Sequence, residues 1–331
     1  MTAVALCVLA LCAFVVLALQ SRVSHEFFDG EDTIFVSVAS YRDTECAATL
    51  KNMFDQADKP ARVFVGVCEQ NDPEAADKEA CAPLRLPKNV RRVSIPSSEA
   101  KGPTYARYLC STLYQGETWF MQIDSHTRFA KGWDTKAIAS ARACPSAKPV
   151  LTHYPRKVED FASEDAGVPV LCKSSFDHNG VPTFESIIMA PPKDGKPRRV
   201  PFVSGGFVFM PGSAVRDVPY DPDLPHLFQG EEILHSARLW TSGYDFFTPL
   251  QNIVYHFYER KGKPKFWDDV DWNSTQKQTL KKVRRLLGLD QPVLVDYRYG
   301  MGTARKLEDY WKFAGVDVLR KTSESKTKFC A

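Results

Sequence analysis

The stretch from residue 119 to residue 134, WFMQIDSHTRFAKGWD, constrains the fold more than any other part of the sequence. Its aromatic and apolar start, residues 119–123, predicts a strand buried on both faces. The run then ends on Asp124-Ser125-His126, and strand alternation puts the carboxylate and the imidazole on one side. Oxygen and nitrogen ligands so placed form half of a site for Mn, Mg or Zn. The alternative is that Asp124 caps a turn and His126 is an ordinary surface histidine.

An alternation of strands and helices surrounds this stretch and predicts the fold class. The expected elements are strands at 33–39, 62–68, 90–95 and 119–123, with helices at 45–57, 102–114 and 133–143. This order is typical of an α/β protein with a mostly parallel central sheet flanked by helices, a Rossmann-like arrangement. In such sheets the ligand site lies beyond the carboxyl ends of the strands.

Polar residues follow three of the predicted strands at that edge. Residues 40–42 (SYR) follow the first strand, Glu69 follows the second, and Asp124 and His126 follow the fourth. Because the carboxyl ends of parallel strands meet at one edge of a sheet, we expect these side chains to lie near one another. Their shared location favours the metal-site interpretation of Asp124 and His126 over the capped turn.

The second half of the chain is less regular. Short apolar runs predict strands at 150–154, 245–249 and 253–257. Residues 160–194 are expected to be mainly loop, with one strand at 184–189. Residues 202–210 (FVSGGFVFM) predict a strand whose two glycines mark a bend or a close backbone approach. Further expected elements are a helix that opens at 229–232 and runs through residue 240, a basic amphipathic helix at 274–287, and a mobile polar tail from residue 321.

Net charge and cysteine usage exclude some classes of protein. The formal charge of +3 is too small to indicate a nucleic-acid partner, so none is expected. Nine cysteines are present, but no C-x-x-C pair, which argues against a structural zinc site. Disulfides among the seven cysteines beyond the apolar N-terminus are expected in an oxidising lumen, with at least one thiol left unpaired and a connectivity that stays open.

Six short motifs, taken in order, resemble one enzyme family. They are SYRD after the first strand, AKGPTYAR at a helix start, DSH after the aromatic strand, SGGF, GEE and a late HFYER. The set is similar to the polypeptide α-N-acetylglucosaminyltransferase family, a relative of the polypeptide N-acetylgalactosaminyltransferases. The resemblance covers roughly residues 33–267 and implies a nucleotide-sugar glycosyltransferase fold of the A type. It also implies transfer of GlcNAc from UDP-GlcNAc to Ser, Thr or hydroxyproline of a polypeptide.

By this resemblance, Asp124 and His126 hold Mn²⁺ or another divalent cation on the donor diphosphate, and His256 completes the metal site. A cation there would offset the charge of the leaving UDP. A core histidine in an aromatic cluster remains the alternative for His256.

The resemblance assigns the donor nucleotide to two other segments. Ser40, Tyr41 and Arg42 are expected to meet the nucleotide, and Arg107, on the helix after Gly102, is expected to contact it. The planar fork of an arginine pairs bidentately with phosphate, which makes this role physically sensible.

The sugar of the donor is expected near Gly205 and Gly206, because a residue without Cβ lets a ring approach the backbone. Glu231 and Glu232 take the place of an acidic residue near the sugar hydroxyls or the reacting centre. The implied reaction retains the α configuration, either on one face of the sugar or through a covalent intermediate on one glutamate. The sequence leaves open which route operates and which glutamate acts.

An apolar run and the resemblance together predict the domain organisation. Residues 3–19 carry no charge or strongly polar side chain, so we expect a transmembrane signal-anchor at 1–20 and a stem at 21–32. The resemblance places the glycosyltransferase catalytic domain at 33–268, and a C-terminal basic helix and tail at 269–331 are expected to pack on or beside it. A cleavable signal peptide is the alternative at the N-terminus. The apolar segment favours a type II Golgi membrane protein with a lumenal catalytic domain over a secreted or cytoplasmic one.

Three other functions stay open at this point. One is a transferase that uses another UDP-sugar, and a second is a non-catalytic carbohydrate-binding relative that kept the fold. The third is a secreted metal-dependent hydrolase, although two-metal hydrolases usually need more than three Asp and His ligands.

Overall fold

The computed structural model describes residues 31–75, 78, 80–81, 88–161, 167–259, 262–269, 272–291 and 297–330. The signal-anchor predicted at 1–20 lies outside the described residues, as does most of the stem predicted at 21–32. Within the described part of the chain, no helix combines the length and the apolar character needed to cross a membrane.

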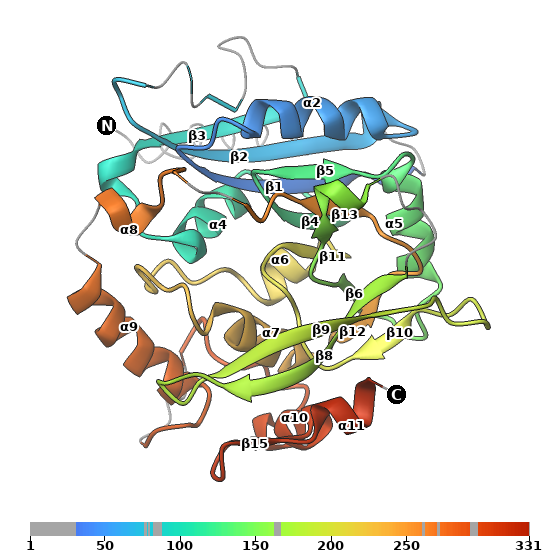
Figure 1. Cartoon of the computed structure of the whole chain (residues 1–331), viewed down its shortest axis with the longest axis vertical. Helices are drawn as coiled ribbons and strands as arrows, with labels where there is room; N and C mark the ends of the chain where they lie inside the picture. Colours follow the sequence, from blue (N-terminus) through green and yellow to red (C-terminus); the bar gives the residue numbers. More distant parts are fainter. Residues whose placement is uncertain are drawn as a thin grey trace, which may run out of the picture.

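An eight-stranded mixed sheet forms the centre of the molecule, in the order β10-β12-β6-β11-β4-β1-β2-β3 (Figure 1). Its strands are β1 (Ile34–Tyr41), β2 (Val63–Asn71), β3 (Val90–Pro96), β4 (Trp119–Asp124), β6 (Pro149–Thr152), β10 (Arg198–Val200), β11 (Phe207–Pro211) and β12 (Asp245–Thr248). Strand β1 pairs in parallel with β2 and β4, and β2 pairs in parallel with β3. Strand β11 runs antiparallel between β4 and β6. The first half therefore forms the predicted parallel α/β unit.

Helices cover both faces of this sheet. They are α2 (Cys46–Gln56), α4 (Pro103–Ser111), α5 (Trp133–Arg142), α6 (Ala214–Asp217), α7 (Glu231–Thr241), α8 (Phe266–Asp269), α9 (Asn273–Leu286), α10 (Leu307–Ala314) and α11 (Ser325–Phe329). Figure 1 shows α2 on one side of β1 and β2 and α4 on the other.

The alternation of β1 explains this division into layers. Ile34 and Val36 belong to the core cluster that contains residues of α2 and α5. Phe35, between them, belongs to the cluster that contains residues of α7 and α10. All three side chains are 0% exposed, as expected of a strand buried on both faces.

Shorter strands extend the fold beyond the central sheet. A three-stranded sheet in the order β5-β13-β7 consists of β5 (Thr127–Phe129), β7 (Arg156–Lys157) and β13 (Val254–His256). Two hairpins complete the set: β8 (Val168–Phe176) with β9 (Pro182–Met189), and β14 (Val316–Asp317) with β15 (Thr322–Ser323).

The C-terminal segment differs from the prediction. The prediction of a mobile tail from residue 321 is wrong, because Cys330 forms a disulfide with Cys172 of β8 and α11 packs against that strand. The region 160–194 contains the long strand β8 in addition to the expected β9, since β8 pairs with β9 over most of its length. A second disulfide joins Cys46 to Cys81, and the thiols of Cys68, Cys110 and Cys144 are free and buried. The expectation of at least one unpaired thiol is therefore confirmed.

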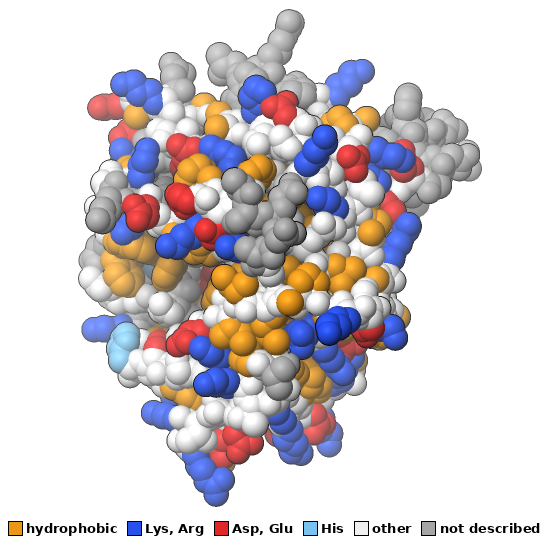
Figure 2. Space-filling model, turned by 45° about the vertical axis from the view of Figure 1, so that its right-hand side comes forward, with side chains coloured by type: hydrophobic (Ala, Val, Ile, Leu, Met, Phe, Trp, Pro, Cys, Tyr) orange, Lys and Arg blue, Asp and Glu red, His pale blue; other side chains and the backbone are white. Residues whose placement is uncertain are grey.

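Lysine and arginine side chains are spread over the face drawn in Figure 2, with acidic side chains among them, and hydrophobic side chains lie across its middle. The exposed cations of the C-terminal segment are Lys312, Arg320, Lys321, Lys326 and Lys328. The C-terminal segment is therefore solvated on its outer face, while Tyr310 and Trp311 of α10 join the core.

Candidate active site

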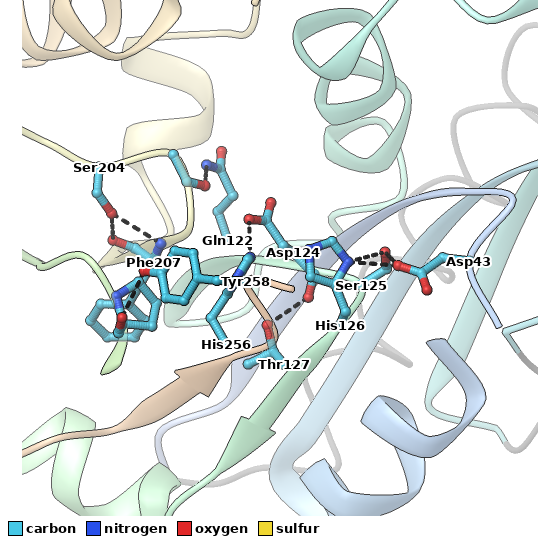
Figure 3. Close-up of polar contacts among 12 residues, drawn as sticks. Asp43, Gln122, Asp124, Ser125, His126, Thr127, Ser204, Phe207, His256 and Tyr258 are labelled. Carbon is cyan, nitrogen blue, oxygen red and sulfur yellow. Dashed lines mark hydrogen bonds and ion pairs between the residues drawn. The ribbon is translucent and has the colours of Figure 1, made fainter. Parts of the chain in front are cut away.

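Three side chains that the sequence singles out as metal ligands come together at the carboxyl end of β4. Asp124, His126 and His256 offer ligand atoms that all lie within 4.8 Å of one another (Figure 3). The Oδ2 atom of Asp124 is 3.1 Å from Nε2 of His256, and the two imidazole rings are 4.5 Å apart. One divalent cation can bridge ligands at this separation, and a carboxylate with two imidazoles suits Mn²⁺ or Zn²⁺. The donor set therefore fits the expected cation.

Strand register produces this cluster. Asp124 is the last residue of β4, and the chain then turns into β5. Strand β13 pairs antiparallel with β5 so that His256 lies opposite Thr127, next to His126. Asp124 and His256 are 132 residues apart in the sequence, and the pairing of β5 with β13 brings them together.

Arg107 links the metal cluster to the rest of the site. Its Nη2 is 3.4 Å from Oδ1 of Asp124, and its Nη1 is 2.6 Å from Oε1 of Glu231. Burial lowers the pKa of Arg107, but the carboxylates of Glu231 and Asp124 outweigh burial and raise its pKa. Burial likewise raises the pKa of Asp124, while His256 and Arg107 outweigh it and hold that pKa below its usual range. Both groups are charged at neutral pH.

The peptide of Gly205 is held on both sides. Its N–H donates to Oε1 of Glu232 over 2.6 Å, and its carbonyl accepts from Nη2 of Arg107 over 3.0 Å. The same carbonyl accepts from Nε2 of Gln122 over 2.6 Å. The chain bends here and joins the sheet only at Phe207, so the strand predicted at 202–210 is wrong in its first half. The Ser204 hydroxyl causes this bend, because it accepts from the N–H of Phe207 over 3.1 Å.

The two glutamates at the start of α7 have different surroundings. Glu231 pairs with Arg107, and Thr104 donates to its other oxygen over 3.3 Å. Glu232 accepts from the Tyr154 hydroxyl over 2.6 Å and from the N–H of Gly205. Burial raises the pKa of Glu232 to about 7, and the hydrogen bonds only partly counter that effect. The first glutamate is an ion-pair partner, and the second is poised to exchange a proton near neutral pH.

These residues line one cavity of about 580 Å³. Its wall includes the metal cluster, both glutamates, Arg107, Gly205 and Gly206. A second cavity of about 150 Å³ adjoins it and shares Tyr41, Arg107 and Trp267 with it. Gly102 lines this smaller cavity, at the N-terminus of α4 with a φ of 85°.

Two of the residues predicted to meet the nucleotide lie elsewhere. Ser40 is 0% exposed within the sheet and is not among the described residues that line either cavity. Arg42 is also absent from the described linings, because its guanidinium pairs with Asp72 at 3.3 Å and Asp269 at 2.7 Å. Tyr41, which lies between them, lines both cavities and donates to Asp269.

Sequence reasoning missed several residues of the site. Tyr154 and Gln122 hold Glu232 and Gly205 in place, and Trp267 lines both cavities. Asp43 contacts His126 directly. A polar residue inside or directly after an apolar strand was the available signal for Gln122, Tyr154 and Asp43, since burial of such groups requires hydrogen-bond partners.

Three solved structures are similar to the chain at low sequence identity. The crystal structure of GalNAc-T7 with UDP, GalNAc and Mn²⁺ matches with a TM-score of 0.55 and 13% identity, over 86% of this chain and 55% of that one. Residues 1–349 of TarS from S. aureus match at 0.46 and 12%, over 81% and 67% of the two chains. The mannosyltransferase PcManGT from Pyrobaculum calidifontis, with GDP-Man and Mn²⁺, matches at 0.46 and 13%, over 88% and 76%. The likeness to GalNAc-T7 shows the fold, and this chain spans about half of that protein.

No curated protein sequence matches the chain. A family model, described as glycosyltransferase (GlcNAc), matches residues 33–86 and 74–320. The match includes the metal cluster, Gly205 and both glutamates of α7, and it favours a glycosyltransferase over the metal-dependent hydrolase. Because these two ranges make up most of the 331 residues, the chain belongs to the glycosyltransferase (GlcNAc) family.

Proposed function

We propose that this protein is a divalent-metal-dependent, retaining glycosyltransferase that moves GlcNAc from UDP-GlcNAc to a hydroxyl of a polypeptide. One observation carries the proposal: a single cavity brings the Asp124–His126–His256 cluster together with the held peptide of Gly205 and the two glutamates of α7. The fold shared with GalNAc-T7, whose crystal structure contains UDP, GalNAc and Mn²⁺, supports the choice of a UDP-sugar donor.

Each part of a UDP-sugar has a place of matching chemistry in this proposal. The nucleoside occupies the cavity of about 150 Å³ beside Tyr41, Gly102 and Trp267. The diphosphate lies at Asp124 and Arg107, where the guanidinium supplies positive charge. The sugar ring lies against Gly205 and Gly206, with Glu232 below it.

A cation held by Asp124, His126 and His256 would offset the charge that develops on the leaving diphosphate. Glu231 keeps Arg107 in position through their 2.6 Å ion pair. Glu232 keeps lone pairs that can accept from a sugar hydroxyl. With a pKa of about 7 it is partly protonated at neutral pH, and hydrogen bonds from Tyr154 and Gly205 stabilise its carboxylate, so it is a weaker nucleophile than an unbound carboxylate. We therefore favour transfer on one face of the sugar over a covalent intermediate.

The acceptor side of the cavity suits an extended chain. Tyr258 is 49% exposed and lines the larger cavity but not the smaller one, while Phe228, 48% exposed, lies where the two cavities adjoin and lines both. Exposed aromatic side chains at a cavity mouth give contact area to a polypeptide at low conformational cost. We propose Ser, Thr or hydroxyproline as the acceptor residue.

The test is a screen for UDP release. Purified protein is incubated with UDP-GlcNAc, UDP-GalNAc, UDP-Glc or UDP-Gal and Mn²⁺, with and without Thr-rich or hydroxyproline-rich peptides. We expect slow release from UDP-GlcNAc alone and faster release with one peptide, with retention at the anomeric carbon by NMR. If UDP is released only from a different UDP-sugar, that sugar replaces GlcNAc in the proposal. Binding of UDP and Mn²⁺ without any release of UDP would instead indicate a non-catalytic carbohydrate-binding relative.

We propose a Golgi location with a lumenal catalytic domain. The two disulfides support an oxidising compartment, since such bonds are rare in the cytosol. Asn273 begins an N-glycosylation acceptor, N-S-T, and is exposed at the start of α9. When the protein is expressed in eukaryotic cells, we expect enzymatic removal of N-glycans to lower its mass, and we expect no such shift in Asn273→Gln. Cytosolic immunostaining would contradict the proposed location.

A further inference from the structure

Asp43 contacts the metal cluster from behind. It is 1% exposed and follows β1, and Figure 3 shows its carboxylate directed at the imidazole of His126. Its Oδ2 lies 2.6 Å from Nδ1 of His126 and accepts from the Ser125 hydroxyl over 2.6 Å. Its Oδ1 accepts from the backbone N–H of Glu45 over 3.0 Å. Both carboxylate oxygens are therefore fixed in direction.

The backbone at Arg42 brings Asp43 to this position. Arg42 has a φ of 45°, in the left-handed region that non-glycine residues seldom adopt. Its N–H still donates to the carbonyl of Gln70 over 3.1 Å, so the chain leaves the sheet at this residue. A costly conformation of this kind persists only where the surrounding structure requires it, and it is frequent at functional sites.

The contact determines which imidazole nitrogen of His126 carries hydrogen. An ionised carboxylate only accepts hydrogen bonds, so Nδ1 must be the N–H that donates to Asp43. In the neutral imidazole Nε2 then carries the lone pair, on the side of the ring that faces Asp124 in Figure 3, and His126 lines the cavity with Asp124 and His256. A metal-binding histidine needs this state, and a carboxylate on its other nitrogen makes it a stronger ligand.

We propose that Asp43 is a positioning residue that fixes His126 in the Nδ1–H tautomer and thereby sets the affinity of the site for a divalent cation. The inference rests on the proposed function, because it takes Asp124, His126 and His256 as metal ligands. It adds an asymmetry between the two histidines. Nδ1 of His256 is buried and has no hydrogen-bond partner among the described residues, so only His126 has a carboxylate behind it.

A purely structural role is the competing explanation. The Asp43 carbonyl accepts from the N–H of Cys46 over 3.2 Å, and its side chain binds the N–H of Glu45, at the start of α2. In that case, removal of the Asp43 side chain would destabilise the start of α2 and would have no separate effect on His126. The experiment must therefore measure the state of His126 and not stability alone.

Asp43→Asn separates the two roles. If the amide NH₂ faces His126, it donates to Nδ1, which moves the hydrogen to Nε2 and blocks that nitrogen for a metal. If the amide oxygen faces His126, the NH₂ group opposes the N–H of Glu45 and the side chain is no longer fixed. Either orientation weakens metal binding. Glu45→Gln is the matched control, because Glu45 pairs with Arg128 at 2.7 Å and lies two residues further along the same segment.

Two measurements use the full-length protein in the absence of a sugar donor and a polypeptide acceptor. Electron paramagnetic resonance titration gives the Kd for Mn²⁺, and ¹⁵N NMR of histidine-labelled protein gives the tautomers of its seven histidines. We expect Asp43→Asn to raise the Kd by about 10- to 100-fold and to reduce the Nδ1–H signal of His126. Glu45→Gln should leave both unchanged.

The outcomes separate this inference from the proposed function. If the wild-type protein does not bind Mn²⁺, both are overturned. If the wild type binds and Asp43→Asn binds equally well, or binds more weakly with an unchanged His126 tautomer, only the positioning role is overturned. Should Asp43→Asn not fold, Ser125→Ala replaces it, because it removes one hydrogen bond to the same oxygen. That variant should raise the Kd about 2- to 10-fold, and an unchanged Kd would reject the role.

Discussion

The two ends of the cavity are built in different ways. At the metal end, Asp124 and His256 are the last residues of β4 and β13, and sheet pairing sets their separation. At the sugar end, Gly205 lies in a bend and Glu232 in the first turn of α7, and side-chain hydrogen bonds hold both. Strand register is shared by many backbone bonds, whereas each hydrogen bond at the sugar end depends on one side chain. The backbone of the metal end should therefore keep its shape when one ligand is removed, whereas at the sugar end a single substitution should displace the groups that it holds.

The largest effect is expected from loss of a metal ligand. His126→Ala and His256→Ala should each lower UDP release by about 10²- to 10³-fold, because developing charge on the diphosphate is no longer offset. The sheet pairing should keep the fold intact, which circular dichroism checks. A separate Mn²⁺ titration checks that the metal site is lost. Full activity in either variant would contradict the assignment of that histidine as a ligand.

Substitution of Glu232 should have the next largest effect. Glu232→Gln should lower UDP release roughly tenfold, as expected for one hydrogen bond to a charged group, and leave the Kd for Mn²⁺ unchanged. A loss as large as that in His126→Ala, together with a sugar detected by mass spectrometry on Glu232 of the wild-type protein, would instead identify Glu232 as a covalent nucleophile.

The same glutamate predicts a pH dependence of stability. Its pKa rises from 4.5 to about 7 on folding, so between these values the native protein holds a proton that the unfolded chain releases. The free energy of unfolding should therefore fall as pH increases from about 4.5 to about 7. Urea unfolding of wild type and Glu232→Gln at pH 5 and pH 8 measures this, and the variant should lack that part of the slope. Equal slopes would show that Glu232 is ionised throughout.

A glycine pair allows a finer comparison of the two ends. A Cβ at Gly205 would lie 2.9 Å from Oε1 of Glu231 and 3.3 Å from Nη2 of Arg107, so Gly205→Ala should displace that ion pair. A Cβ at Gly206 would be 3.4 Å from Oδ2 of Asp124, an ordinary contact. We expect the KM for the donor to rise several-fold in Gly205→Ala and to change less in Gly206→Ala. Equal effects in steady-state kinetics would remove the distinction.

The smallest effect on catalysis is expected from the disulfide between Cys172 and Cys330. The double variant Cys172→Ser with Cys330→Ser should lose about 2–4 kcal/mol of unfolding free energy, measured by urea titration, and keep most activity at 25 °C. Near-complete inactivation would mean that the hairpin of β8 and β9 is more closely coupled to the cavity than its lining residues Pro182, Thr183 and Phe184 indicate.

Parts of this architecture could be predicted from the sequence because they follow local patterns. Asp124 stands out at the end of an apolar run, and a parallel sheet brings such ends to one edge. The role of Asp43 could not be predicted, since it depends on the left-handed φ of Arg42 and on a partner 83 residues away. The left-handed backbone of Arg42 also accompanies the direction of its side chain, which pairs with Asp269 and does not line the cavity. The bend at Gly205 was visible as a glycine pair, but its hydrogen bond from Gln122 of β4 was not, nor was the contact of Tyr154, which follows β6, with Glu232.

The disulfide between Cys172 and Cys330 also constrains when the site can be completed during synthesis. Its partners are 158 residues apart, whereas Cys46 and Cys81 are separated by 35. The shorter bond can form while most of the chain is still on the ribosome. The longer one requires residue 330 to have been released, so the hairpin of β8 and β9, which lines part of the cavity, is joined to α11 after the first disulfide can form. In a newly made chain, the segment after β1 can thus be crosslinked before this part of the cavity wall is fixed.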